Sequence, residues 1–183
     1  MVYPIVAFGD PVLRKRAQDI PQGTDLSALV NDMFDTMYNA NGVGLAAPQI
    51  GKSIRIFVVD GEPMGEDELK GFKKVFVNPT ILNETGEAWA FEEGCLSIPN
   101  IREDVEREEK VIIKYFDENW VEKKGEFEGL QARIIQHEYD HLEGVLFTDH
   151  LSSLKKRLLK GKLSNISKGK VKIDYTMKFP IKG

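Results

Sequence analysis

The sequence predicts an α+β fold in which antiparallel strands surround a central helix. Two segments, residues 26–38 and 130–142, place apolar side chains at helical spacing. Several β-rich segments lie between them, and two of these flank a short polar turn. The 183 residues contain no internal repeat and no low-complexity segment, so we expect one domain spanning residues 1–183.

The first helix is expected after the break at Pro21-Gln22-Gly23, where Thr24 or Asp25 can cap it. Its apolar residues recur at helical spacing: Leu26, Leu29, Val30, Met33, Phe34, Met37 and Tyr38. The helix is expected to end near Asn41-Gly42, because such residues tolerate the left-handed conformation that commonly follows a helix.

The middle of the chain is strand-like. The β-rich segments are residues 54–59, 75–77, 111–116 and 120–127. Residues 61–71 are polar and contain glycine, which predicts a loop. Asp117-Glu118-Asn119 separates the last two segments and predicts a hairpin turn.

A second helix is expected over residues 130–142, ended by Gly144. It carries Leu130, Ile134, His137, Glu138 and His141 on one face. A short third helix is expected over residues 151–159. The tail over residues 170–179 alternates apolar and polar side chains, which predicts a strand.

The composition excludes several classes of protein. A net charge of −4 argues against a general nucleic-acid or membrane role. No apolar run approaches the ~20 residues that a transmembrane helix needs, and the N-terminus lacks the features of a secretory signal. The single cysteine, Cys95, can form no internal disulfide, which fits a reducing compartment. We therefore expect a cytoplasmic protein.

Residues 137–141 form the pattern H-E-x-x-H. On a helix, two histidines four residues apart can bind one metal ion while the intervening Glu138 serves as a base. The chain has only three histidines, and two of them share a face with apolar residues, which favours a metal site over a solvated surface. A third ligand is required: Cys95 is the strongest candidate, while His150 or a distant glutamate remains open.

Residues 42–49, Gly-Val-Gly-Leu-Ala-Ala-Pro-Gln, are rich in glycine and free of charge. They lack the Gly-Lys-Ser/Thr ending of a phosphate-binding loop. The segment predicts either a turn into a buried element or a backbone edge offered to an extended peptide. Gln49 would then supply an amide that can polarise a carbonyl.

Together, three segments resemble the signature motifs of the peptide deformylases: residues 42–49, 93–97 (Glu-Gly-Cys-Leu-Ser) and 136–141 (Gln-His-Glu-Tyr-Asp-His). Residues 9–14 are similar to the N-terminal region of that family, so the resemblance spans roughly residues 5–150. It implies a metal-dependent hydrolase that removes the N-terminal formyl group from nascent polypeptides. The tail over residues 161–183 departs from the commonest bacterial form, which ends in a long helix.

The resemblance also implies roles for individual residues. Cys95, His137 and His141 would bind one divalent ion, usually Fe²⁺, which Zn²⁺, Ni²⁺ or Co²⁺ can replace. Glu138 would act as general acid and base, and Gln49 and the Leu96 amide would stabilise the oxyanion. The residues implied near the substrate are Val43, Gly44, Glu93, Arg102, Leu130 and Ile134.

Other functions remain open at this point. A metallopeptidase that cuts internal peptide bonds would need the same metal and glutamate. A binding module with a structural metal site would need a fourth protein ligand. A cysteine nucleophile at Cys95 would leave the H-E-x-x-H spacing unexplained. The basic residues from Lys155 to Lys172 form either a solvated surface or a contact with ribosomal RNA.

Overall fold

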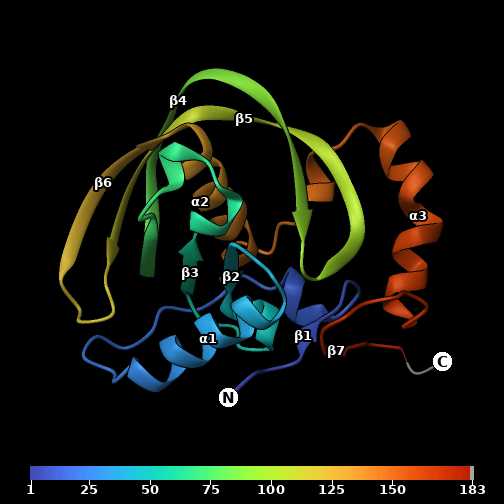
Figure 1. Cartoon of the computed structure of the whole chain (residues 1–183), viewed down its shortest axis with the longest axis horizontal. Helices are drawn as coiled ribbons and strands as arrows, with labels where there is room; N and C mark the ends of the chain where they lie inside the picture. The colour runs from blue at the N-terminus through green and yellow to red at the C-terminus, as the bar shows by residue number, and fades with distance from the viewer. Residues whose placement is uncertain (182–183) are drawn as a thin grey trace.

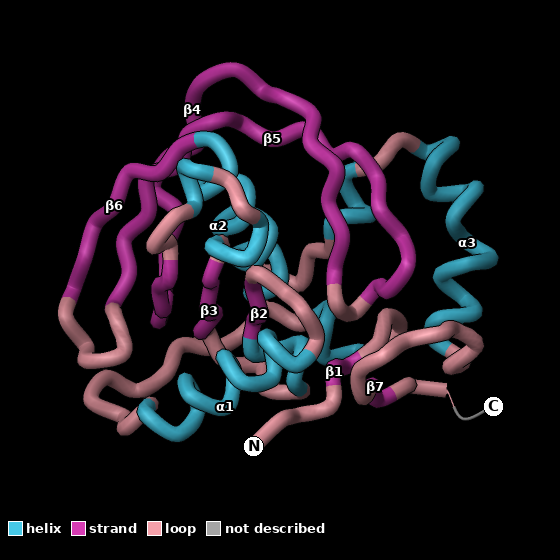
Figure 2. The backbone as a smooth tube through the Cα atoms, in the orientation of Figure 1, coloured by secondary structure: helices cyan, strands magenta, loops and turns pink. Residues whose placement is uncertain are grey.

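The computed structural model describes residues 1–181 and has an antiparallel sheet wrapped around one helix (Figures 1 and 2). The sheet runs in the order β2-β3-β4-β5-β6. Its strands are β2 (Gly44–Ala46), β3 (Ile56–Asp60), β4 (Lys73–Cys95), β5 (Ile98–Phe116) and β6 (Glu122–Glu128). Helix α2 (Gly129–Leu142) lies under the arch that β4 and β5 form. The α+β fold expected from the sequence is confirmed.

Two further helices flank this unit. Helix α1 (Ser27–Asn39) lies below the sheet in Figure 1, and α3 (Ser153–Ser167) forms the right-hand edge of the molecule. A small parallel pair joins β1 (Ile5–Val6) to β7 (Met177–Lys178), so a segment near the start of the chain lies beside one near its end. No helix within residues 1–181 is long and apolar enough to cross a membrane.

The long hairpin of β4 and β5 is the main departure from the sequence prediction. These strands have 23 and 19 residues, far above the usual strand length of about 5–6. The register shifts at four places along the pair, and such bulges bend a strand and increase its twist. The hairpin therefore curves over α2 and brings its turn, at Leu96 and Ser97, down to the far side of that helix.

Within this hairpin, only the start of β4 and the end of β5 were predicted to be strands. The segments 75–77 and 111–116 lie over the core, whereas residues 82–88 are exposed on both faces. A strand with two solvated faces lacks the alternation by which strands are recognised in a sequence. The predicted loop over residues 61–71 contains two short 3₁₀ turns, Glu62–Met64 and Asp67–Leu69.

Within residues 1–181 the core consists of three apolar clusters. One lies between α2 and the concave face of the sheet, where Phe57 and Phe76 stack with their ring centroids 4.7 Å apart. A second joins α1 to β2 and β3, and a third packs α3 and its preceding turn against β5. Burial of apolar side chains contributes roughly 25 cal/mol of stability per Å² of apolar surface, and the first cluster thereby holds α2 against the sheet.

The first two of the three predicted helices form close to their expected bounds. Helix α2 begins at Gly129, whose φ of 61° suits glycine, and stops before Gly144, with φ of 75°. A β-carbon on Gly144 would lie 2.6 Å from the carbonyl oxygen of Arg14, so the chain passes too closely for any side chain there. The helix accordingly ends at Leu142, one residue after His141.

The C-terminal region differs from the prediction in two ways. Helix α3 extends to Ser167, well beyond the expected residue 159, and is capped by Ser152, whose hydroxyl accepts from the Lys155 amide at 3.2 Å. In the tail only Met177–Lys178 forms a strand. The side chains of the tail nevertheless alternate between half-buried and exposed over residues 171–178. The alternation thus reflects an extended backbone that lies on the protein surface. Most of this backbone is not paired with another strand.

Candidate active site

The three predicted metal ligands come together from two elements. Cys95 ends β4, while His137 and His141 lie one turn apart on α2. One ligand atom from each residue lies within 4.8 Å of the others. The Cys95 Sγ and the His141 Nε2 are 3.4 Å apart. A tetrahedral ion with bonds of 2.3 Å to sulfur and 2.1 Å to nitrogen would separate them by about 3.6 Å.

Both histidines present a ring nitrogen to the site. His141 is 1% exposed, and its Nε2 lies beside the Cys95 sulfur. Burial lowers the pKa of His141 to about 3, so the ring is neutral and can act as a ligand. The His137 Nδ1 lies 2.8 Å from a Glu93 carboxylate oxygen, which leaves Nε2 facing the site.

Glu93 is the centre of a buried charge network beneath this cluster. Its carboxylate accepts from Arg107 at 2.7 and 3.0 Å and from Arg133 at 2.8 Å. Burial alone would raise the pKa of Glu93, but the hydrogen bonds from His137 and Arg107 hold it well below its usual range. The carboxylate therefore stays charged and fixes the orientation of the His137 ring.

His150, considered as a ligand from the sequence, belongs to this network and not to the metal cluster. Its Nε2 lies 2.8 Å from Asp140, which also accepts from Arg107 at 2.9 Å. The cluster of potential ligands found within residues 1–181 contains Cys95, His137 and His141. Three protein ligands leave one tetrahedral position free, as catalytic sites do.

Glu138 lies near the Nε2 side of the His137 ring, whereas Glu93 lies at its Nδ1 side. It is 5% exposed, its Oε1 is 3.9 Å from the His137 Nε2, and its Oε2 has no partner within residues 1–181. Burial raises the pKa of Glu138 to about 7. A carboxyl group with a pKa near neutrality can both accept and return a proton.

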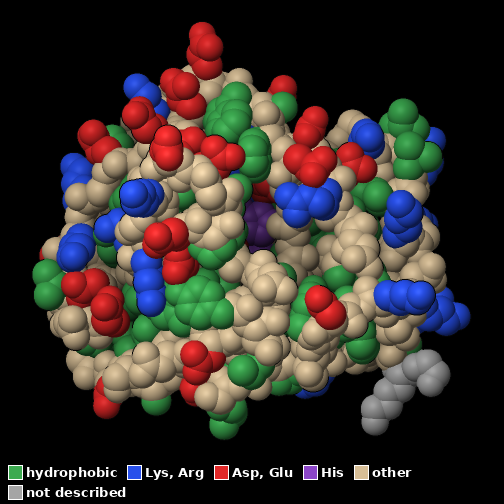
Figure 3. Space-filling view, in the orientation of Figure 1, with side chains coloured by type: hydrophobic (Ala, Val, Ile, Leu, Met, Phe, Trp, Pro, Cys, Tyr) green, Lys and Arg blue, Asp and Glu red, His purple; other side chains and the backbone are tan. Residues whose placement is uncertain are grey.

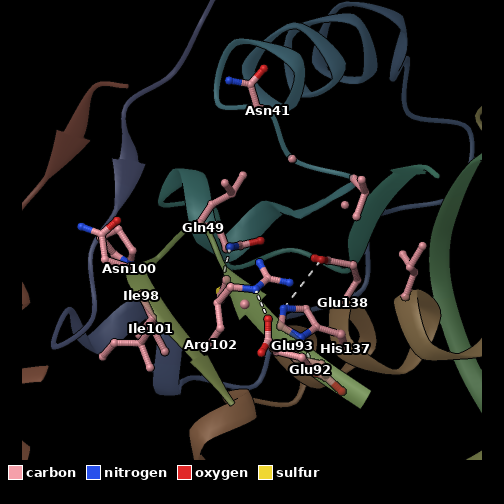
Figure 4. Close-up of a pocket in the computed structure, with 18 of the residues that line it drawn as sticks. Asn41, Gln49, Glu92, Glu93, Ile98, Asn100, Ile101, Arg102, His137 and Glu138 are labelled. Atoms are coloured by element: carbon pink, nitrogen blue, oxygen red, sulfur yellow. Dashed lines mark hydrogen bonds and ion pairs between the residues drawn. The ribbon is translucent and has the colours of Figure 1, made fainter. Parts of the chain in front are cut away.

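Gln49 is held so that its NH₂ group points toward Cys95. Its Oε1 accepts from the Ala46 amide at 3.0 Å, and its Nε2 donates to the Ser97 hydroxyl at 3.2 Å and to the Cys95 sulfur at 3.4 Å. The neighbouring N–H of Leu96 has no acceptor within residues 1–181. Figure 4 shows Gln49, His137 and Glu138 pointing toward the same space.

This space is a cavity of about 820 Å³. The space-filling view shows it as a hollow with a histidine at its base (Figure 3). Its wall is built from the loop before β2, the turn between β4 and β5, helix α2, and residues 172–175 of the tail. Its volume lies within the ~300–1,000 Å³ typical of small-molecule and peptide sites.

Comparisons with known proteins agree with this geometry. Residues 2–157 match the family model described as polypeptide deformylase. The chain is 58% identical to a peptide deformylase of Cytophaga hutchinsonii over the full length of both, and 57% identical to one of Christiangramia forsetii over 98% of this chain and 97% of the relative. The chain belongs to the polypeptide deformylase family.

Solved deformylase structures share the fold. A peptide deformylase from Legionella pneumophila is 42% identical, with a TM-score of 0.81 over 93% of this chain and 98% of its own. One from Synechococcus elongatus, in complex with actinonin, is 38% identical, with a TM-score of 0.78 over 92% and 87%. The resemblance drawn from the three motifs is thus confirmed.

Five of the six residues predicted to lie near the deformylase substrate line the cavity, and one does not. Val43, Gly44, Glu93, Arg102 and Ile134 contribute to the cavity wall. Leu130 is not part of the lining found within residues 1–181. It is buried in the same apolar cluster as Ile134, one helical turn away.

Sequence reasoning missed several residues that line the cavity: Met64, Phe91, Asn100, Ile173 and Tyr175. Phe91 lies on the inner face of β4 two residues before Glu93, and its place near the second motif was the only signal for it. Nothing in the sequence connects the tail to the site, because Tyr175 is 79 residues away from Leu96, its contact.

Proposed function

We propose that this chain hydrolyses the formyl amide at the N-terminus of formyl-methionyl peptides and releases formate, as a metal-dependent peptide deformylase. The observation that carries the proposal is the meeting of Cys95, His137 and His141 beside the buried Glu138, in a cavity large enough for a peptide end. Membership of the deformylase family supports it. In this proposal residues 1–183 act as one catalytic domain.

Cys95, His137 and His141 would hold one divalent ion, and the thiolate and imidazole set suits several metals. We propose Fe²⁺ as the physiological ion, with Zn²⁺, Ni²⁺ or Co²⁺ able to replace it. When bound, such an ion acts as a Lewis acid and lowers the pKa of water from 15.7 to about 7. Glu93 holds the His137 ring in the orientation that this role requires.

Glu138 removes a proton from the attacking water and delivers it to the amine that leaves. Its pKa near 7 lets the same carboxyl group perform both transfers. The Leu96 N–H, together with the Gln49 N–H that points toward Cys95, would donate to the oxygen of the formyl carbonyl as negative charge develops there. Removing one such donor typically reduces the rate by about 10²–10³.

The substrate would bind along β2. This strand is at the edge of the sheet, with β3 on its other side, so an extended peptide can pair with the backbone at Val43 and Gly44. The methionine side chain would enter the apolar part of the cavity beside Ile134, with Leu130 packed behind it. Arg102, whose Nε donates to Glu92 at 2.9 Å, lines the cavity and would contact later residues of the peptide.

A formate-release assay separates this function from its rivals. The protein is purified without oxygen, its metal content is measured, and it is given a formyl-methionyl tripeptide or an N-blocked peptide with only internal bonds. Release of formate from the first, with the second left intact, is expected. Cleavage of internal bonds would favour a metallopeptidase, and bound metal with neither reaction would favour a structural site.

We further propose that the chain acts in the cytoplasm on nascent peptides, close to the ribosome. Helix α3 supports this because its basic side chains are exposed: Lys155, Lys156, Arg157, Lys160 and Lys162. Figure 3 shows several of the basic groups gathered at that edge of the molecule. Sedimentation with ribosomes at low and high salt tests the contact, since binding to phosphate weakens steeply with salt. Binding that persists after Lys156→Glu with Lys160→Glu would exclude α3 as the contact.

A further inference from the structure

The extended tail forms one side of the cavity. Residues 172–175 contribute to the cavity wall opposite α2, next to the turn that joins β4 to β5. The match to the family model covers residues 2–157 of this chain. The tail therefore adds a contact to the site that the matched region does not contain.

We propose that Tyr175 is a positioning residue that holds the Leu96 turn so that the Leu96 N–H faces the reacting carbonyl. The inference rests on the proposed function, because it concerns the oxyanion donor of that reaction. Tyr175 acts through Leu96 and touches none of the reacting atoms itself.

One hydrogen bond carries the proposal. The Tyr175 hydroxyl donates to the carbonyl oxygen of Leu96 at 2.7 Å, near the ideal distance for such a bond. Burial, with the nearby charge of Cys95, raises the pKa of Tyr175, so the hydroxyl keeps the proton that it donates. The ring packs against the apolar cluster that includes Leu45 and Met37.

The tail is anchored on both sides of Tyr175. The Asn100 Nδ2 donates to the Lys172 carbonyl at 2.8 Å, and the Ile5 amide donates to the Thr176 carbonyl at 2.9 Å. The parallel pairing of β1 with β7 follows directly. Because these bonds fix the backbone before and after it, Tyr175 presents its hydroxyl from a rigid support.

The Leu96 side chain packs against the same apolar cluster as Tyr175, but the other hydrogen bonds of the turn go to Ser97. The Phe8 amide donates to the Ser97 carbonyl at 2.9 Å, and Gln49 donates to the Ser97 hydroxyl. Within residues 1–181 the Leu96 carbonyl accepts only from Tyr175, and the Leu96 N–H has no acceptor. Loss of the Tyr175 hydroxyl would thus remove the hydrogen bond that Leu96 itself makes and loosen the residue whose amide must stay aligned.

Tyr175→Phe tests this, because it removes the hydroxyl and keeps the ring. We expect kcat for a formyl-methionyl peptide to fall roughly 3- to 10-fold, the effect of one neutral hydrogen bond, with KM changed by less than about 2-fold. The metal content should match that of the wild type. The matched control is Tyr38→Phe, which removes a hydroxyl bonded to Asp60 at 2.6 Å on the surface of α1, outside the cavity, and should leave kcat unchanged.

A second measurement does not depend on turnover. In the zinc-loaded protein, the ¹⁵N relaxation order parameter of the Leu96 amide should fall in Tyr175→Phe and stay at the wild-type value in Tyr38→Phe. Asn100→Gly, which releases the tail at Lys172 and suits the φ of 65° at that position, should give a smaller change of the same kind. This variant also tests the proposal if Tyr175→Phe folds poorly.

The outcomes separate the two proposals. If the wild type releases no formate, the proposed function fails, and the relaxation measurement alone decides the role of Tyr175. If the wild type is active and Tyr175→Phe keeps both its kcat and the order of the Leu96 amide, the positioning role is overturned. A rise in KM with unchanged kcat and unchanged order would also overturn it, because Tyr175 would then be only a wall of the cavity.

Discussion

Gly44→Ala should disable the site by displacing Glu138. Gly44 begins β2 and lies against the Glu138 side chain. A β-carbon at residue 44 would be 2.6 Å from Oε1 of Glu138 and 2.8 Å from both its Cδ and its Cγ. Ordinary contacts begin at 3.4 Å, so the carboxyl group or the strand must move by about 0.8 Å to relieve the closest contact.

The structure indicates that the side chain moves and not the strand. The β2 backbone is paired with β3 through Gly44 and Val59, and its following residues are fully buried. A misplacement of about 1 Å can reduce a rate by roughly 10²-fold. We therefore expect kcat to fall about 10²-fold, and the free energy of unfolding to fall by about 1–3 kcal/mol from overpacking.

The assay is formate release at saturating peptide, with metal content and thermal unfolding measured on the same sample. Gly161→Ala is the matched control, because its β-carbon would meet nothing within 4 Å and it lies within α3. It should leave kcat unchanged and raise stability by up to about 1 kcal/mol.

A double-mutant cycle isolates the clash. In a Glu138→Ala background the atoms that Gly44→Ala would strike are gone, so its destabilisation should largely vanish. The reasoning is refuted if Gly44→Ala keeps kcat within about 3-fold of the wild type. It is equally refuted if the loss of stability is the same in both backgrounds.

Further predictions concern the proton carrier, the thiolate and an ion pair remote from the site. Glu138→Ala should keep its metal and lose at least about 10²-fold in kcat; near-normal turnover would remove Glu138 from the mechanism. Cys95→Ser should bind metal far more weakly, and a chelator should abolish formate release by the wild type until metal is restored; a metal titration as tight as that of the wild type would exclude the thiolate ligand. Asp149→Asn should cost at most about 1 kcal/mol of stability at pH 7, because its pair with Arg14 is half exposed. Although burial opposes it, the hydrogen bond from Arg14 lowers the pKa of Asp149 below 3.8. The stabilisation by the ionised Asp149 is therefore present above pH 3.8 and is lost as the pH falls through its folded-state pKa. The free energies of unfolding of variant and wild type, measured in urea, should become equal at that low pH. A constant difference down to pH 2 would contradict the assignment.

The metal ligands and the helices could be predicted from the sequence because both depend on spacing along a short stretch of chain. Helical spacing places His137 and His141 on one face, so the pattern defines their geometry without knowledge of the rest of the fold. The apolar positions of α1 predict its bounds to within a residue or two in the same way. Cys95 as third ligand came from chemistry and from the resemblance of its motif.

Contacts between distant segments could not be read in this way. The polar middle of the β4–β5 hairpin carries no alternation, since both of its faces are solvated. The role of Glu93 as the partner of Arg107, Arg133 and His137 depends on β4, β5 and α2 meeting. The proximity of Gly44 to Glu138 depends on the packing of β2 against α2.

The sequence by itself determined the chemistry: a thiolate, two imidazoles, a carboxylate and an amide, each within a short motif whose spacing is a property of the local backbone. Only the tertiary structure decided how the tail completes the cavity. Its alternation predicts an extended segment but names no partner, because hydrogen-bond acceptors such as the Leu96 carbonyl are identical along any chain. Which of them Tyr175 meets is fixed by the anchors at Asn100 and Ile5, and those exist only once the chain has folded.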